Sequence, residues 1–350
     1  MQKDKYIAYV GTYTHGSSKG IHIFDLDVEA GKMIERKVVT VKNPSYVCRS
    51  IDGKHLYSIS DEGVEAFKIE VDGDLTSINK KGIDGMRGCY LSVDKSGKFL
   101  YVGGYHDGRV TVLGLNEDGS LGEIKDGIFH KGLGRVVERN FRPHVTCVVP
   151  TPDGKYLCGV DNGIDQVKIY EVNSENGKLR LIDILRCELG SGPKRMKFSK
   201  DGKFAYLTCE IKNVINVYSY DGTGAAPQFE LLQSIETFMP SNADGGCLAA
   251  ALKLTNDGKY LLGSSAGDNS ASIYEVDTKS GLLEKICVLP ISGIYPKDLD
   301  VFPDNRHMIS LNHGSDEIRI FAIDYKNKIF TLKGKPLAIE TPNCILVTKL

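Results

Sequence analysis

The sequence predicts an all-β protein, a seven-bladed β-propeller of four-stranded antiparallel blades, organised as a single domain over residues 1–350. Three observations lead to this prediction. A short turn phrase recurs along the whole chain, strand-like runs flank each copy, and a lone apolar run near the C-terminus matches a strand that the N-terminal unit lacks. The repeat spacing also favours one large β-domain over two ordinary domains.

Each copy of the phrase has the composition of a tight hairpin turn. Glycine at its centre allows the positive φ that such a turn needs. Successive copies are 44 to 57 residues apart, in or just above the range of about 40 to 50 residues that is typical of four-stranded propeller blades. The copies are Asp52-Gly53-Lys54, Ser96-Gly97-Lys98, Asp153-Gly154-Lys155, Asp201-Gly202-Lys203, Asp257-Gly258-Lys259 and the weaker Asp304-Asn305-Arg306.

The segments between the turns have the pattern of strands. Apolar runs lie on both sides of each turn, as at residues 145–149 and 156–158. A third run carries an aromatic residue, as in Ile169-Tyr170-Glu171-Val172, and a polar turn then leads to a fourth short strand. The apolar spacing of 3.6 that helical repeats require is missing, so the repeat unit is four strands joined by turns.

The two ends of the chain complete one another. Residues 6–10 and 21–24 form strand-like runs that no innermost strand precedes, and residues 344–348 form a single apolar run after the last complete unit. We expect this C-terminal strand to pair into the N-terminal blade and so to close a ring of seven blades of about 50 residues each. Closure protects strand edges that would otherwise promote aggregation, and loss of the last residues should destabilise the fold.

Composition and charge exclude several classes of protein. The chain has 44 Lys and Arg against 45 Asp and Glu, a net charge of -1, so no overall field attracts nucleic acid or an anionic membrane. No stretch has the roughly 18 apolar residues of a membrane span, and the N-terminus lacks a secretory signal pattern, so we expect a cytoplasmic location. Nine scattered cysteines without a Cys-x-x-Cys motif favour reduced, buried thiols. The oligomeric state is left open, and a monomer is compatible with the sequence.

Short motifs along the chain resemble the seven-bladed lactonase family of bacterial 6-phosphogluconolactonases and fungal carboxymuconate-lactonizing enzymes. The resemblance covers essentially the whole sequence, and this chain is identified as a divergent member. The motifs that carry it occur in the family's order, each at the same place in a blade. They are Gly11-Thr12-Tyr13-Thr14, Asn43-Pro44-Ser45-Tyr46, Gly103-Gly104-Tyr105 with Gly108, Arg142-Pro143-His144, Gly190-Ser191-Gly192-Pro193, Glu210, and Gln233 with Pro240.

Four of these residues are candidates for the chemistry of a site. His144 starts an innermost strand, Lys194 and Arg195 start the next one, and Glu210 ends that blade's second strand, where propeller ligands usually bind. A histidine titrates near neutral pH, so His144 is the predicted general base and Glu210 orients it or a water molecule. Lys194 and Arg195 are predicted to bind the substrate's acidic group and to stabilise the oxyanion.

Other residues are predicted to surround this chemistry. Tyr13, Asn43 and Tyr105 are expected to form pocket walls or to pack beside them, and the basic loop of Lys131, Arg135, Arg139 and Arg142 is a candidate pocket rim for an anionic ligand. Without the resemblance, a histidine before a strand more often caps a turn, and such charges are more often solvated. No metal or cofactor is required, because the eight histidines show no ligand spacing.

The sequence departs from the family pattern at three places. Lys194-Arg195 replaces the usual Arg-His after Gly-Pro, and lysine lacks the bidentate fork of arginine. Ala266 stands where the family carries a cation, and Thr146 where it has a second histidine. Either the basic loop before His144 compensates, or this chain has changed its substrate or lost activity.

The resemblance implies three functions that the sequence does not separate. The first is a hydrolase of carbohydrate metabolism that opens an acidic sugar lactone, most simply 6-phosphogluconolactone in the pentose phosphate pathway. The second is a carboxymuconate-type lactonizing cycloisomerase, which the missing cation at Ala266 disfavours. The third is a non-catalytic propeller that binds a sugar acid or a protein partner.

Overall fold

The computed structural model describes residues 4–134, 141–238 and 248–350. In these ranges the chain forms strands β1 to β28, which pair into seven four-stranded sheets and confirm the predicted all-β class and blade count. Internal contacts divide the chain into two compact units. One comprises Met1–Val47, Val71–Asp74 and Ile235–Leu350, and the other comprises Cys48–Glu70 and Leu75–Ser234. That the chain forms a single domain stays a prediction.

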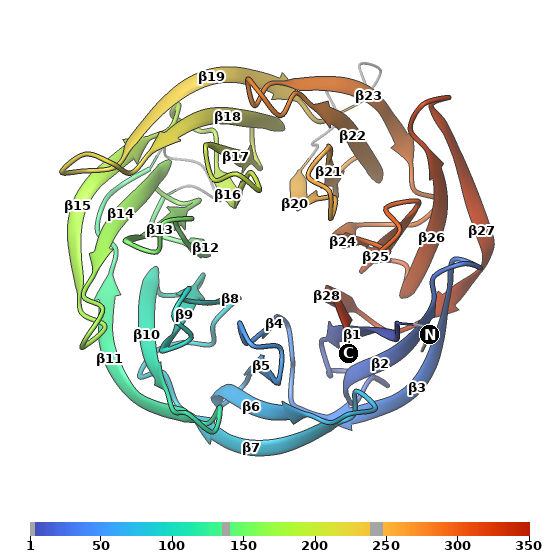
Figure 1. The fold of residues 1–350 in the computed structure, drawn as a ribbon, viewed down its shortest axis with the longest axis horizontal. Coiled ribbons are helices and arrows are strands. Elements are labelled where there is room, and N and C mark those ends of the chain that lie inside the picture. The colour runs from blue at the N-terminus through green and yellow to red at the C-terminus, as the bar shows by residue number, and fades with distance from the viewer. Residues whose placement is uncertain (1–3, 135–140, 239–247) are drawn as a thin grey trace. The chain divides into compact units, whose positions relative to one another are not determined.

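The first unit contains three of the sheets (Figure 1). In sheet order, their strands are β28 (Pro342–Lys349), β1 (Tyr6–Thr12), β2 (Gly20–Asp27) and β3 (Lys32–Thr40); β20 (Ala249–Leu254), β21 (Tyr260–Ser265), β22 (Ser270–Val276) and β23 (Leu283–Pro290); and β24 (Pro296–Val301), β25 (His307–Asn312), β26 (Glu317–Asp324) and β27 (Ile329–Ala338). We call the first strand of each sheet in this order its inner strand.

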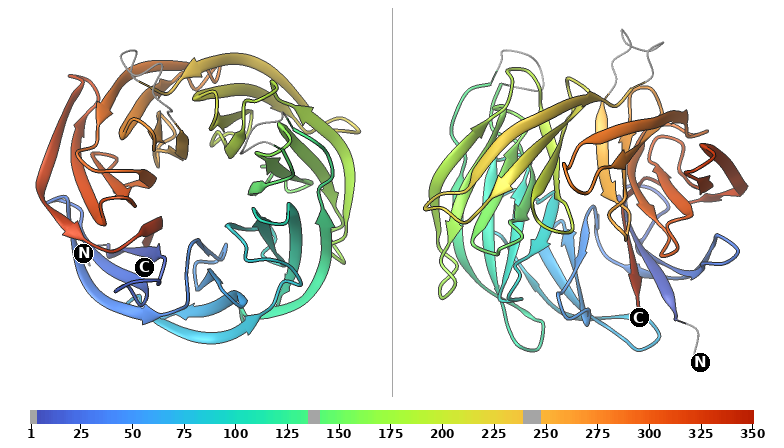
Figure 2. Two further views of the ribbon diagram at one scale, coloured as in Figure 1. Left: turned by 180° about the vertical axis from the view of Figure 1, so that it is seen from behind. Right: turned by 45° about the horizontal axis from the view of Figure 1, so that its top comes forward.

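The second unit contains the other four sheets, which follow one another in chain order (Figure 2). Their strands, inner strand first, are β4 (Val47–Arg49), β5 (His55–Ser60), β6 (Gly63–Ile69) and β7 (Leu75–Lys81); β8 (Tyr90–Val93), β9 (Phe99–Gly104), β10 (Arg109–Leu115) and β11 (Leu121–Phe129); β12 (Val145–Pro150), β13 (Tyr156–Asp161), β14 (Gln166–Val172) and β15 (Leu179–Arg186); and β16 (Pro193–Phe198), β17 (Phe204–Cys209), β18 (Val214–Asp221) and β19 (Gln228–Glu236).

The recurrent turn phrase joins an inner strand to the second strand, as predicted. Its central residue has a positive φ in all six copies, from 59° at Asn305 to 77° at Gly53, which explains why glycine or asparagine occupies the position. The aspartate of the phrase closes the turn: Asp201 Oδ1 accepts hydrogen bonds from the Ser199 hydroxyl at 2.6 Å and from the Lys203 amide at 3.2 Å. We call the opposite end of each sheet its open end.

These aspartates should make the fold sensitive to acid. Burial opposes ionisation of Asp52, Asp153, Asp201 and Asp257, but the hydrogen bonds of the turn outweigh it and lower each pKa below the usual 3.8. A carboxyl with a depressed pKa in the folded state contributes stability above its unfolded pKa and loses it as the pH falls through the folded value. We therefore expect the melting temperature to fall steeply below about pH 3.8. The Asp201→Asn variant should show a shallower decline, and an unchanged pH profile would contradict this account.

The C-terminal strand completes the N-terminal sheet, as the sequence predicts. Strand β28 pairs antiparallel with β1, Val347 opposite Ala8 and Ile345 opposite Val10, and both chain ends leave the sheet on the same side (Figure 2). Two backbone amides on the other edge of β28 also have acceptors. Asp298 accepts a hydrogen bond from the Ile345 amide at 3.0 Å, and Asp300 accepts one from the Val347 amide at 3.1 Å. The carboxylates of β24 thus bind backbone amides that would otherwise be an exposed strand edge.

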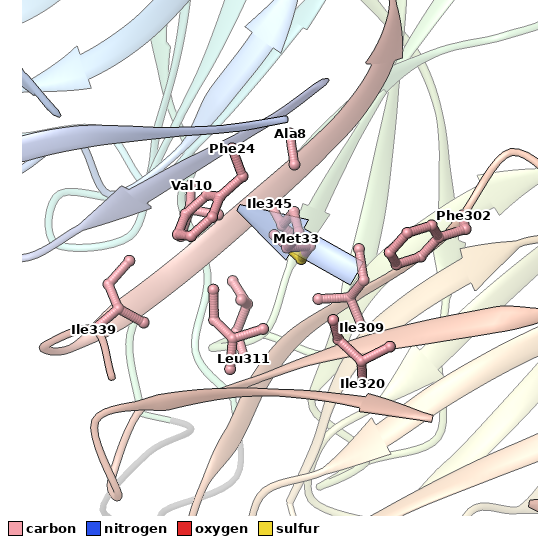
Figure 3. Packing of buried hydrophobic residues seen from close by; sticks show 11 residues of the cluster. Ala8, Val10, Phe24, Met33, Phe302, Ile309, Leu311, Ile320, Ile339 and Ile345 are labelled. Atoms are coloured by element: carbon pink, nitrogen blue, oxygen red, sulfur yellow. The ribbon is translucent and has the colours of Figure 1, made fainter. Parts of the chain in front are cut away.

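The core of the first unit lies between neighbouring sheets. Side chains of β1, β2, β25, β26 and β28 interdigitate there, and all eleven residues of this cluster are less than 10% exposed (Figure 3). They are Ala8, Val10, Phe24, Met33, Phe302, Ile309, Leu311, Ile318, Ile320, Ile339 and Ile345. Because residues far apart in sequence supply this packing, the two chain ends depend on each other for stability.

No helix in the described part of the chain is long and apolar enough to cross a membrane. Eight of the nine cysteines lie in the described ranges, and these eight are free thiols.

Candidate active site

The repeat places the predicted catalytic residues at the open ends of two neighbouring sheets in the second unit. His144 directly precedes inner strand β12, Lys194 is the second residue of inner strand β16, and Glu210 directly follows β17. All three are largely buried, with His144 4% exposed and the Lys194 and Glu210 side chains 11% and 12% exposed. The prediction placed His144 and Glu210 inside their strands, and the structure places each of them one residue beyond the strand end.

The His144 ring is fixed by Tyr105. The two rings stack with centroids 4.3 Å apart and planes inclined by 15°, and His144 Nδ1 lies 2.6 Å from the Tyr105 carbonyl oxygen. A carbonyl oxygen only accepts hydrogen bonds, so Nδ1 must carry the proton and the neutral ring keeps its lone pair on Nε2. Tyr105 thereby sets the tautomer that a general base requires.

A buried carboxylate holds the backbone of His144. Asp161, the last residue of β13, accepts hydrogen bonds at Oδ1 from the His144 amide at 2.7 Å and from the Gly163 amide at 3.0 Å. Its Oδ2 lies 2.7 Å from His130 Nδ1, and both side chains are fully buried. Burial lowers the pKa of His130, partly offset by Asp161, so the imidazole is neutral near pH 7 and donates from Nδ1.

A glycine is required beside this anchor. A Cβ on Gly163 would collide with the Arg142 carbonyl oxygen and would lie 2.9 Å from Cδ2 of His144. The tight turn after β13 therefore packs directly against the His144 imidazole, and any side chain at this position would displace that ring.

Lys194, Glu210 and Asn162 form one polar cluster. Lys194 Nζ lies 2.5 Å from Glu210 Oε1, and the Asn162 amide donates at 3.1 Å to both Glu210 Oε2 and the Gly192 carbonyl oxygen. The Asn162 backbone amide in turn donates to the His144 carbonyl oxygen at 2.9 Å. Asn162 thus connects the open end that carries His144 to the one that carries the Lys194–Glu210 pair.

Arg195 takes a different direction from Lys194. Its guanidinium donates to the Thr146 carbonyl oxygen at 2.9 Å and stacks over the Tyr90 ring, 4.7 Å from the centroid. Thr146, the residue that replaces a family histidine, donates from its hydroxyl to the Lys194 carbonyl oxygen at 2.9 Å. Arg195 and Thr146 therefore hold β12 and β16 together.

The basic loop before His144 is described only in part. Arg142 is exposed and lies over the Phe141 ring at 5.5 Å, and that ring meets the His144 ring edge-on at 6.4 Å. The Lys131 carbonyl oxygen accepts a hydrogen bond from Lys168 at 3.2 Å. Arg135 and Arg139 lie outside the described residues.

The predicted wall residues Tyr13 and Asn43 belong to the first unit. Asn43 is buried, has a φ of 49°, and accepts a hydrogen bond from the Thr14 amide at 2.7 Å. This contact orders the loop after β1. The Tyr13 ring lies edge-on to His313, with centroids 5.8 Å apart. Their roles as substrate contacts stay predictions.

His130, Asp161 and Asn162 were absent from the predicted site. A local signal existed for Asn162, because it follows β13 as Glu210 follows β17, and comparison of the repeats would have found it. His130 and Asp161 carry no such signal, since their contact joins strand ends 31 residues apart and depends on side-chain orientation.

Comparison with known proteins places this chain in one family. The model of the family described as "Lactonase, 7-bladed beta-propeller" matches residues 7–347. A 6-phosphogluconolactonase of Bacillus subtilis strain 168 is 31% identical, covering 97% of this chain and 98% of its own length. The solved structure of the periplasmic gluconolactonase of Pseudomonas aeruginosa superposes with a TM-score of 0.92 at 29% identity, covering 98% of this chain and 99% of its own.

A Lactococcus lactis subsp. cremoris strain MG1363 protein of uncharacterised function is 32% identical, covering 96% of this chain and 98% of its own. The chain is thus a seven-bladed β-propeller. It belongs to the seven-bladed β-propeller lactonase family.

Proposed function

We propose that this protein hydrolyses 6-phosphogluconolactone to 6-phosphogluconate. The observation that carries the proposal is the His144 tautomer, since the 2.6 Å contact with the Tyr105 carbonyl oxygen leaves the Nε2 lone pair as a base. Family membership and the 31% identity to a 6-phosphogluconolactonase support a lactone substrate. The cytoplasm is the proposed location.

In the proposed reaction, His144 Nε2 takes a proton from water as the water oxygen attacks the lactone carbonyl carbon. The carbonyl oxygen becomes negative, and the Lys194 ammonium stabilises it. The ring C–O bond then breaks, and the imidazolium returns the proton to the leaving oxygen. Glu210, paired with Lys194 at 2.5 Å, and Asn162 orient the water and the cation.

The test is hydrolysis of freshly generated 6-phosphogluconolactone, corrected for its spontaneous opening. We expect His144→Ala to lower the catalysed kcat/KM by about a hundredfold, the typical contribution of a general base. His55→Ala is the matched control, because His55 begins β5 at the turn end of its sheet and should retain full activity. Equal rates for wild type and His144→Ala at the uncatalysed level would end the enzymatic interpretation.

One observation favours a non-catalytic role as the second candidate. The close pairing of Lys194 with Glu210 neutralises a cation that the lactonase proposal assigns to the oxyanion. A protein of this kind would bind 6-phosphogluconate without turning over the lactone. Binding by calorimetry, measured beside the hydrolysis assay, separates the two functions.

A further inference from the structure

Three positions recur at the open ends of the sheets that begin with β12, β16 and β24. In each sheet the first residue of the inner strand pairs with the last residue of the second strand, and a bulge follows: Val145 opposite Asp161, Pro193 opposite Cys209, and Pro296 opposite Asn312. Because the register is the same, three positions can be compared between these sheets: the residue before the inner strand, the residue at the bulge, and the residue after the second strand. The aligned sets are His144, Gly192 and Tyr295; Thr146, Lys194 and Lys297; and Asn162, Glu210 and His313.

The backbone hydrogen bonds confirm this alignment. The Glu210 amide donates to the Gly192 carbonyl oxygen at 2.6 Å, and the His313 amide donates to the Tyr295 carbonyl oxygen at 2.9 Å. Lys297 and His313 therefore hold, in the β24–β27 sheet of the first unit, the positions that Lys194 and Glu210 hold in the second. The family resemblance did not single out either residue.

The side chains of Tyr13, Tyr295, Lys297 and His313 lie close together. The His313 ring lies 5.7 Å from the Tyr295 ring and 5.8 Å from the Tyr13 ring, centroid to centroid. The Lys297 ammonium lies 5.3 Å from the centroid of Tyr295. All four residues are partly exposed, so aromatic faces, an imidazole and a cation border one accessible place at the open ends of the β24–β27 and β28–β3 sheets.

The imidazole offers an acceptor. His313 Nδ1 lies 3.2 Å from the Pro342 carbonyl oxygen, so Nδ1 carries the proton and Nε2 the lone pair. Burial lowers the pKa of His313, and the Lys297 charge lowers it further. The neutral ring suits a ligand hydroxyl rather than an anion.

The backbone of Tyr295 is strained. It has a φ of 58°, almost the value of 63° at its equivalent, Gly192. A bulky residue rarely adopts this conformation, and such backbone strain is found preferentially at ligand sites. Glycine would satisfy the backbone here, so the tyrosine side chain needs another explanation.

We propose that Tyr13, Tyr295, Lys297 and His313 form a binding site for a hydroxylated carboxylic acid of the sugar-acid class. The two tyrosine rings contact the carbon faces of the ligand, His313 Nε2 accepts from a hydroxyl, and Lys297 pairs with the carboxylate or a phosphate. The proposal concerns binding, so it does not depend on the lactonase reaction proposed above.

The test follows the histidine ring signals of the full-length protein by NMR during titration with 6-phosphogluconate, and separately with gluconate. We expect the His313 signals, assigned with His313→Asn, to shift saturably. Lys297→Met should raise the Kd measured at these signals roughly tenfold, as expected for loss of one charge-assisted contact. Lys333→Met, the same charge change on the exposed outer strand β27, should leave the Kd unchanged.

Tyr295→Gly gives a second, independent measurement. Glycine relieves the positive φ, so the variant should melt no lower than wild type while binding at least fivefold more weakly. Unshifted His313 signals with both ligands, or an unchanged Kd in Lys297→Met, would overturn the site even if the lactone is hydrolysed. Absence of hydrolysis with a Kd that depends on Lys297 would instead remove only the lactonase proposal.

Discussion

Deletion of the C-terminal strand β28, Pro342–Lys349, is expected to abolish cooperative folding of the first unit. The strand supplies the pairing partner of β1, and Ile345 is 8% exposed in the core of this unit (Figure 3). Its loss would expose β1 and would remove the Ile345 and Val347 amides that donate to the carboxylates of Asp298 and Asp300. Because a domain is stable by only about 5–15 kcal/mol, loss of one strand of a four-stranded sheet exceeds what the unit can tolerate.

The measurement is denaturant unfolding followed by circular dichroism, with two controls. Removal of Leu350 alone, which loses one backbone hydrogen bond to Lys5, should cost little. Ile345→Ala should cost about 2–5 kcal/mol, as expected for a buried large-to-small substitution. A truncated protein that unfolds cooperatively at the wild-type midpoint would show that β28 does not complete the fold.

The sequence was most informative where structure is local. The hairpin turns require a positive φ at one residue, so glycine, or asparagine in one copy, marks them directly. The six turns together with the unmatched strands at the two chain ends predicted seven blades. The closing strand was predictable as well, because an apolar run without a partner at one end matched a missing strand at the other. The positions of His144 and Glu210 at strand ends followed from the same repeat.

Side-chain directions were harder to predict. Lys194 and Arg195 are adjacent, and successive residues of a regular strand point to opposite faces. In the structure a bulge lies between Pro193 and Arg195. Whether both side chains reach one ligand therefore depends on a local irregularity that the sequence does not reveal. Arg195 contacts Thr146 and Tyr90, and its role in binding substrate stays a prediction.

Tertiary contacts and repeat comparison account for the other omissions. The His130–Asp161 pair could not be inferred, since only the tertiary fold brings the two side chains together. Alignment of Pro193-Lys194 with Pro296-Lys297 would have revealed that Lys297 and His313 hold the positions of Lys194 and Glu210.

Asp161→Ala is expected to destabilise the protein by about 3–5 kcal/mol, because each buried donor left without an acceptor costs about 1–3 kcal/mol. The change leaves three buried donors without their acceptor: His130 Nδ1 and the amides of His144 and Gly163. Asp161→Asn should cost less, because its carbonyl oxygen still accepts from both amides. Its NH₂ group would, however, face His130 Nδ1 and force the ring proton onto Nε2, which has no partner among the described residues.

Asp165→Ala is the comparison for this stability effect, since Asp165 is equally buried and accepts two backbone amides, those of Gly190 and Gly192, at 2.7 and 2.9 Å. The excess cost at Asp161, measured by denaturant unfolding, reports the His130 contact. Asp161 touches no reacting atom in the proposed reaction, so it is a positioning residue and Asp161→Asn should lower kcat while leaving KM nearly unchanged. An equal loss of stability in the two alanine variants, or an unaltered kcat in Asp161→Asn, would mean that the buried pair does not hold His144 in place.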